Sequence, residues 1–233
     1  MADGEGSPRV PSVPLDTPTF GLPTWAAEGQ EGGPYHSRVP HVPSPNSGVT
    51  VGRGYDLKER DAAAVIQDLM ASGVSKADAE ALSKGVGLRG DKAKEFIEKN
   101  LRPGLEITSN SQLKLFERAY GEKLNTARRV CDKADVVRKY GRCDWDALDP
   151  AIQDIVVDMT FRGDYRPNTR EFVQCHIVEN DLVGLRSAVL DPQKVPGVPP
   201  DRQKIRADFF DHAIAEREQL AKREACIVPA LKS

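Results

Sequence analysis

Three side chains near the N-terminus, Glu28, Thr50 and Asp56, are of the types that acid–base catalysis needs. Glu28 follows the apolar residues 25–27, and a carboxyl in apolar surroundings tends to keep the proton that a general acid donates. Asp56 precedes a charged, helix-forming segment, where backbone N–H groups at a helix start would keep its carboxylate ionised. Two carboxyls in such different environments form the pair that glycoside hydrolysis uses, and Thr50 could hold the attacking water.

Thr50 and Asp56 both lie in a glycine-rich stretch, PNSGVTVGRGYDLKER, at residues 45–60. Its glycines permit a positive φ, while the threonine and valines favour a strand, so the stretch predicts a β-hairpin. An ordinary hairpin, with Thr50 as a strand residue and Asp56 as a helix cap, is the simplest alternative. A phosphate-binding loop is a weaker one, because the stretch contains neither G-x-G-x-x-G nor GK[ST].

Several other residues compete for a role in the same region. Glu31 is also followed by glycine, but it precedes Thr50 by fewer residues than Glu28 does and has more flexible, polar neighbours, which make a poorer general acid. His36 and His41 could shuttle protons or bind a metal, although hydrogen bonding in a cleft or at the surface is the alternative for them and for Arg38. Two residues beside the hairpin turn could meet an acidic sugar or stack on a pyranose ring, namely Arg53 and Tyr55.

The remaining sequence must supply the elements that position these side chains. Residues 1–24 are predicted to be an extended tail, residues 25–220 a single catalytic domain, and residues 221–233 a C-terminal tail. Within the domain, a loop and hairpin over 25–56 precede helices. These helices are expected over 57–73 (capped by Asp56), 75–85 (capped by Ser75), 91–100, 108–130, 148–163 (capped by Asp149), 168–179, 181–190 and 200–220.

The segment LDPAIQDIVVDMTFRG at 148–163 is predicted to be the buried central helix, because apolar residues cover most of its surface. The whole pattern indicates an α+β fold, with a small hairpin-containing N-terminal lobe and a mostly helical C-terminal lobe. A cleft is expected where the two lobes meet.

Composition excludes several classes of function. The 233 residues carry a net charge of −2, which argues against nucleic acid as the main partner. No apolar run reaches the length of a membrane span, and the N-terminus has no classical signal peptide. The four cysteines form no C-x-x-C pair, so a zinc site is not expected. Free or buried thiols are the simplest interpretation, and one disulfide, Cys131 to Cys143, is the alternative. Acid–base hydrolysis needs no cofactor, so none is expected. The other two cysteines are Cys175 and Cys226.

The hairpin stretch resembles a known family. The Glu-Gly pair at 28–29, followed by SGVTVGRGYDL at 47–57, is similar to phage-type lysozymes and most of all to the muramidase domain of pesticin-like bacterial toxins. In that family a Glu-Gly pair ends the first helix and a hairpin carries G-[VI]-T-[VI]-G-x-G. The segments 144–174 and 202–210 resemble the central and closing helices of that family, so the resemblance spans about residues 25–213.

The resemblance assigns roles to residues of this chain. Glu28 matches the catalytic general acid and Thr50 the hydroxyl that positions water. Lysozymes of T-even phages place a second acid six residues before this threonine, where this chain has Ser44, whereas the pesticin-like pattern places it six residues after, at Asp56. Sequence leaves open whether the carboxyls lie about 5 Å apart, as retention requires, or about 6.5–9.5 Å apart, as inversion requires. The resemblance also implies that Phe161 and Arg162 face the substrate, and a position in the hydrophobic core is the alternative for Phe161.

The resemblance implies a lysozyme-like fold and hydrolysis of the β-1,4 bond between N-acetylmuramic acid and N-acetylglucosamine. The expected partner is bacterial peptidoglycan, the expected oligomeric state is a monomer, and the enzyme would act on the cell wall after secretion, injection or lysis. The net charge of −2 is unusual for binding an anionic wall and suggests local basic patches or delivery by another protein. The alternatives are a module that binds peptidoglycan or a protein without cleavage, a lytic transglycosylase, and a chitinase.

Overall fold

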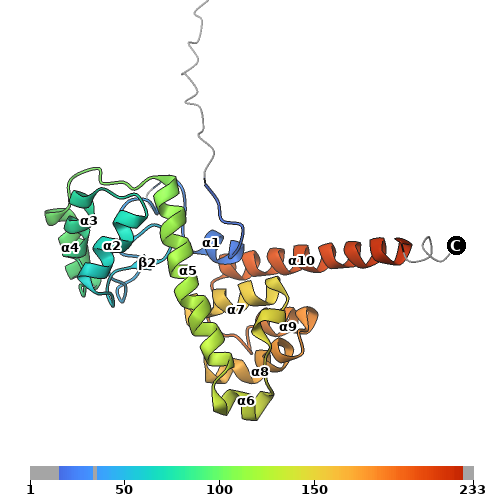
Figure 1. Cartoon of the computed structure of the whole chain (residues 1–233). Helices are drawn as coiled ribbons and strands as arrows, with labels where there is room; N and C mark the ends of the chain where they lie inside the picture. The colour runs from blue at the N-terminus through green and yellow to red at the C-terminus, as the bar shows by residue number, and fades with distance from the viewer. Residues whose placement is uncertain (1–15, 34–35, 228–233) are drawn as a thin grey trace, which may run out of the picture.

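A computed structural model describes residues 16–33 and 36–227 of the chain, with the side chains of 224–227 left out. The described part is mostly helical and contains one small antiparallel sheet, in agreement with the expected α+β class. Its elements, drawn in Figure 1, are α1 (Leu22–Ala27), β1 (Thr50–Val51), β2 (Tyr55–Asp56), α2 (Ala62–Ala71), α3 (Lys76–Ser83), α4 (Gly90–Asn100), α5 (Ser109–Cys131), α6 (Ala134–Tyr140), the 3₁₀ turn η1 (Trp145–Ala147), α7 (Pro150–Arg162), α8 (Pro167–Val178), α9 (Leu182–Val189) and α10 (Pro200–Ile227).

Two hydrophobic clusters divide the molecule. The first, which we call the hairpin lobe, is built on the hairpin and α2–α4; the second, the helical lobe, contains α1 and α7–α10. Helix α5 belongs to both, since Leu115 lies in the hairpin-lobe cluster while Phe116 and Tyr120 lie in the other. Figure 1 shows α5 running from one group of helices to the other, and α10 extending away from the body.

Helix α7 is the central element of the helical lobe, as predicted. Ile152, Ile155, Val156 and Met159 are fully buried. The helix begins as expected, with the Asp149 side chain accepting a hydrogen bond from the Ala151 N–H and proline in the first turn. Burial of four large apolar side chains stabilises the lobe by about 1.5–3 kcal/mol each.

Most predicted helices are present, but one cap is wrong. Asp56 does not begin α2; it lies on strand β2, and the helix starts at Ala62, where the Asp61 side chain accepts from the Ala64 N–H. The cap predicted for Ser75 is confirmed. Helix α1 spans the predicted boundary between residues 24 and 25, and its Pro23 and Thr24 are buried. Helix α6, which was not predicted, and the extension of α10 to Ile227, past 220, also differ from the expectation.

The hairpin holds Thr50 and Asp56 opposite each other. Strands β1 and β2 pair antiparallel with Thr50 facing Asp56 and Val51 facing Tyr55. The turn between them uses Gly52 and Gly54 at φ 65° and 83°, conformations that a side chain disfavours. The six-residue spacing noted in the sequence therefore becomes direct cross-strand pairing.

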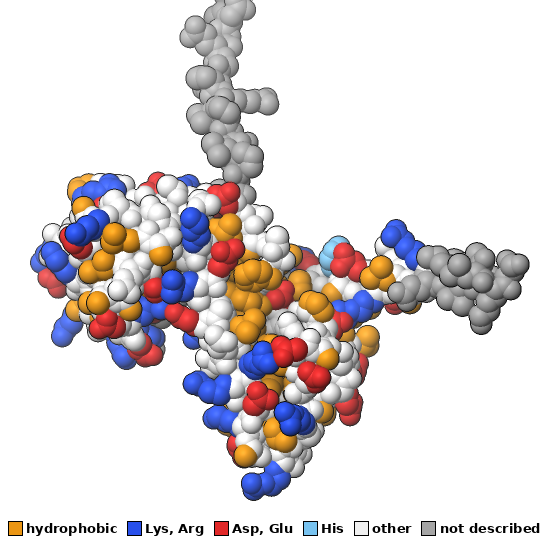
Figure 2. Space-filling model, viewed as in Figure 1, with side chains coloured by type: hydrophobic (Ala, Val, Ile, Leu, Met, Phe, Trp, Pro, Cys, Tyr) orange, Lys and Arg blue, Asp and Glu red, His pale blue; other side chains and the backbone are white. Residues whose placement is uncertain are grey.

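Cys131 and Cys143 are both buried and both free, so the possible disulfide between them is not formed, and Cys175 is exposed and free. The side chain of Cys226 lies outside the described residues. None of the described helices is long and apolar enough to cross a membrane. On the face shown in Figure 2, acidic and basic side chains are interspersed, in keeping with the small net charge.

Candidate active site

One cavity gathers the three predicted catalytic side chains. Its volume is about 430 Å³, and Glu28, Thr50 and Asp56 all line it. They come from the C-terminal end of α1, from β1 and from β2, so elements of both lobes build its wall. The other lining residues are Pro43, Ser47, Gly54, Lys58, Glu59, Arg60, Glu122, Lys123 and Phe161.

Glu28 stands at the end of α1, where its backbone N–H bonds to the Thr24 carbonyl. Its side chain is 21% exposed and forms an ion pair of 2.7 Å with Arg202 on α10. The hairpin turn comes close to it, because a Cβ added to Gly54 would lie 3.6 Å from Glu28 Oε2 and 2.8 Å from the Phe161 ring. The environment of Glu28 is therefore only partly the apolar one predicted, because the charged side chain of Arg202 also contacts its carboxylate.

Asp56 is held by the backbone of its own hairpin. Its carboxylate accepts hydrogen bonds from the N–H groups of Gly48, at 3.1 Å, and Lys58, at 2.8 Å. Thr50 is 3% exposed, and its hydroxyl donates to the Gly48 carbonyl at 3.3 Å. Both side chains thus have fixed directions while still lining the cavity, as positioning a water molecule would require.

A buried chain of charges supports the ion pair of Glu28. Arg202 also binds Asp158 of α7 at 2.6 Å, and Arg206, one helical turn further along α10, binds both Asp158 and Asp164. Asp158 and Arg206 are fully buried. Such charges remain buried only when they are paired, so this chain fixes α10 against α7 and fixes Arg202 beside Glu28.

This network is not among the predicted features, although the sequence contains a signal for it. Asp158 is a charged residue within the otherwise apolar helix at 148–163, and a buried acid needs a basic partner. Arg202 and Arg206 are spaced to share one face of a helix. Nothing local, however, predicts that Arg202 meets Glu28, since 174 residues separate the two.

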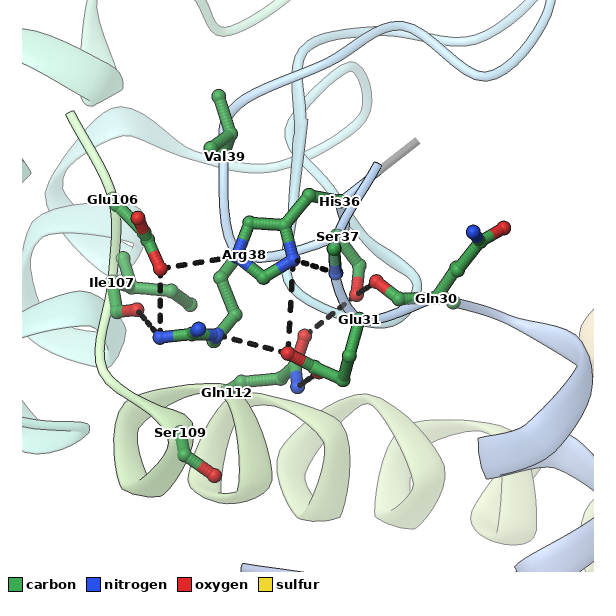
Figure 3. A network of polar contacts seen from close by, with 12 residues as sticks. Gln30, Glu31, His36, Ser37, Arg38, Val39, Glu106, Ile107, Ser109 and Gln112 are labelled. Atoms are coloured by element: carbon green, nitrogen blue, oxygen red, sulfur yellow. Dashed lines mark hydrogen bonds and ion pairs between the residues drawn. The ribbon is translucent and has the colours of Figure 1, made fainter. Parts of the chain in front are cut away.

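Glu31, the rival to Glu28, lies in a different place. It does not line the cavity; its carboxylate accepts hydrogen bonds from Gln112, at 2.6 Å, and Arg38, at 3.0 Å (Figure 3). The same carboxylate lies 3.4 Å from Arg53. Burial alone would raise the pKa of Glu31, but these hydrogen bonds and the two arginine charges hold the pKa below its ordinary value. An acid that ionises so readily suits a structural ion pair better than proton donation at neutral pH.

His36 and Arg38 belong to the same network, which fastens the loop after α1 to the connection between α4 and α5. The Gly32 N–H donates to His36 Nδ1, the other ring nitrogen lies 3.0 Å from Glu106, and Arg38 reaches Glu106 and the Ile107 carbonyl (Figure 3). His41 pairs through its backbone with Thr50, at the edge of the hairpin. None of the three residues lines the cavity, and their described contacts are structural.

Of the four residues expected to bind substrate, only Phe161 lines the cavity, with its ring stacked near Phe116 at 6.4 Å. The Arg53 guanidinium is buried, where it donates to the Trp25 and Gly29 carbonyls and so joins the hairpin to α1. Tyr55 is also buried, and its hydroxyl donates to Asp68. Arg162 binds Asp164 and the Gly197 carbonyl. These last three side chains are therefore structural contacts outside the cavity.

Only one group among the described residues has side chains close enough to share a metal ion, namely His176, Glu179 and Asp181. It lies where α8 leads into α9 and does not line the cavity. His176 Nδ1 already hydrogen-bonds Asp181, which also caps α9 by accepting from the Gly184 N–H. These hydrogen bonds explain why the three side chains lie together, because they stabilise the junction between α8 and α9.

A comparison with curated proteins finds no match. A family model matches residues 21–207, which include the whole cavity lining and Arg202. That model bears the description "Domain of unknown function (DUF8812)". Because the match covers most of the 233 residues, this chain belongs to the DUF8812 family.

Proposed function

We propose that this chain is a peptidoglycan hydrolase with a lysozyme-like fold, which cleaves the β-1,4 bond between N-acetylmuramic acid and N-acetylglucosamine. The observation that carries the proposal is the meeting of Glu28, Thr50 and Asp56 on one cavity wall. Thr50 and Asp56 face each other within one hairpin, whereas Glu28 comes from the end of α1, so its position on the same wall is not a consequence of local spacing. The motif that resembles phage-type lysozymes contains the same three residues.

In the proposed reaction, Glu28 protonates the leaving glycosidic oxygen, and a water molecule held by Thr50 and Asp56 attacks the anomeric carbon. Asp56 accepts the proton of that water as the bond forms. The Glu28–Arg202 ion pair has to open as the substrate enters, and the Glu28 carboxylate has to take up a proton from solvent, so that the carboxyl can donate that proton to the sugar oxygen. Phe161 provides an apolar face against which a pyranose ring can stack.

Clearing of purified bacterial cell walls tests this proposal. We expect the wild-type protein to lower wall turbidity and the Glu28→Gln variant to do so at least about 100-fold more slowly, because general acid catalysis contributes about 10²–10⁴-fold. Glu171→Gln is the matched control, since Glu171 is an exposed α8 residue paired with Lys139, outside the cavity. Equal clearing by wild type and Glu28→Gln, with both folded, would show that the assignment is wrong.

One observation favours a second candidate, a domain that binds peptidoglycan without cleaving it. Glu28 is engaged by Arg202, and a general acid must be free to hold and deliver a proton. A binding domain would sediment with cell walls and release no sugar. The same wall preparation therefore separates the two candidates, since the hydrolase releases soluble fragments and the binding domain does not.

A further inference from the structure

Among the residues that the structure describes, the charges that line the cavity leave one cation without a partner. Glu28 pairs with Arg202, Asp56 lies 4.0 Å from Lys58, and Glu59 lies 3.6 Å from Arg89. Glu122 is bound by both terminal nitrogens of Arg60 at 2.7 Å. Each acidic side chain of the lining thus has a basic partner.

Lys123 is the cavity-lining cation that remains. No hydrogen bond or ion pair joins its ammonium group to any residue of 16–33 or 36–227. The ammonium lies 5.9 Å from the centre of the Phe161 ring, on the same cavity wall. Lys123 lies on α5 and is half-buried, so its ammonium group is held near the face of an aromatic ring instead of being fully solvated.

We propose that Lys123 and Phe161 form a subsite for a sugar that carries a carboxylate. Phe161 would stack on the pyranose ring, and the Lys123 ammonium would pair with the carboxylate attached to that ring. This inference rests on the proposed function and narrows its substrate: the site recognises the lactyl carboxylate of an N-acetylmuramic acid unit and discriminates against neutral chitin.

The geometry favours an acidic glycan over other anionic ligands. The basic side chains that contact the four cavity carboxylates are already engaged by them, so a polyanion such as a nucleotide or a nucleic acid would find too few cations for its phosphate groups. One spare ammonium matches one carboxylate. An aromatic ring beside it suits a pyranose, whose axial C–H groups present an apolar face.

The test uses the disaccharide in which N-acetylglucosamine is linked β-1,4 to N-acetylmuramic acid. It carries the carboxylate but lacks the bond that the enzyme is proposed to cleave, so binding is measured apart from hydrolysis. Chemical-shift titrations compare this disaccharide, its neutral methylamide and N,N′-diacetylchitobiose. We expect wild type to prefer the acidic form by about two- to fivefold, the range for a partly exposed ion pair.

The variants locate that preference. Lys123→Gln should bind the acidic and neutral forms equally, Lys123→Arg should keep the preference, and the matched control Lys133→Gln, exposed and outside the cavity, should also keep it. No preference in wild type, or a preference that survives Lys123→Gln, would overturn the subsite. Hydrolysis of cell walls can still be measured if the subsite fails this test. The binding comparison, in turn, remains valid if the protein does not hydrolyse walls. The failure of one proposal can therefore be told apart from the failure of the other.

Discussion

Glu28 and Glu31 are three residues apart, and their surroundings assign them different tasks. Glu28 lines the cavity beside Phe161 and Gly54. Glu31 does not line the cavity and instead belongs to a network of Gln112, Arg38 and Arg53 that joins the hairpin lobe to α5. The cavity therefore receives a carboxyl from Glu28, and the fold uses Glu31 as an anchor.

The anchor role of Glu31 predicts a specific dependence of stability on pH. Its folded-state pKa lies below the ordinary value of 4.5, so its contribution is fully present above about pH 4.5 and is lost as the pH falls through the folded-state pKa. Glu31→Gln should lower the free energy of unfolding by about 1–2 kcal/mol at pH 7, because the substitution removes hydrogen bonds to a charged carboxylate. Urea unfolding at pH 7 and pH 3 measures whether that deficit shrinks in acid; a constant deficit would refute the role, and Glu171→Gln is the control.

The hairpin is the element that makes the cavity, and its turn depends on Gly54. A Cβ at this position would approach the Phe161 ring to 2.8 Å, so glycine allows the turn to lie against α7. Helix α7 in turn is fixed by the ion pairs of Asp158 with α10. The positions of Glu28, Asp56 and Phe161 relative to one another therefore depend on packing between elements as well as on the hairpin itself.

Because the site depends on packing of the hairpin against α7, we expect alanine substitutions at two glycines with similar φ angles to have different effects on wall clearing. Gly54 has φ 83° and Gly163 has φ 87°, but nothing lies within 4 Å of a Cβ at Gly163. Each change to alanine should lower stability by about 1–2 kcal/mol, the cost of the left-handed conformation, and Gly54→Ala should cost more than Gly163→Ala because of its contact with Phe161. Only Gly54→Ala should also slow wall clearing, because only it displaces Phe161. Equal clearing rates for the two variants would show that the turn does not shape the site.

The elements also show what sequence can and cannot predict. Helix periodicity and capping residues identify α3, α5 and α7, because these signals are local. The prediction that Asp56 caps α2 is wrong, because an aspartate before a helix-forming segment can equally lie at the end of a strand. The Asp61 side chain caps the helix instead. Arg202 was missed for a different reason: its partnership with Glu28 arises from tertiary packing alone.

At the scale of the whole molecule, α5 joins two hydrophobic clusters that would otherwise be separate. Leu115 and Phe116 are adjacent in sequence, yet one is buried in the hairpin lobe and the other in the helical lobe. The cavity wall draws on both lobes. A relative movement of the lobes would change the distance between Asp56 and Phe161, so the shared helix matters for the site as well as for stability.

The shared helix predicts that the two lobes unfold together. Leu69→Ala should cost about 2–5 kcal/mol, because Leu69 is fully buried in the hairpin-lobe cluster. Both tryptophans of the chain, Trp25 and Trp145, lie in the helical-lobe cluster. Their fluorescence should therefore report the same lowered urea midpoint as far-UV circular dichroism. An unchanged fluorescence midpoint beside a lowered helical signal would mean that the lobes unfold independently.

We propose that the cavity cleaves the muramic acid linkage of peptidoglycan with Glu28 as the acid. The decisive measurement is digestion of purified peptidoglycan, followed by borohydride reduction and mass analysis of the fragments. We predict that wild type generates reduced N-acetylmuramic acid at the new chain ends and that Glu28→Gln generates none above background. New ends of N-acetylglucosamine or of anhydro-muramic acid, or no new ends at all, would contradict the claim.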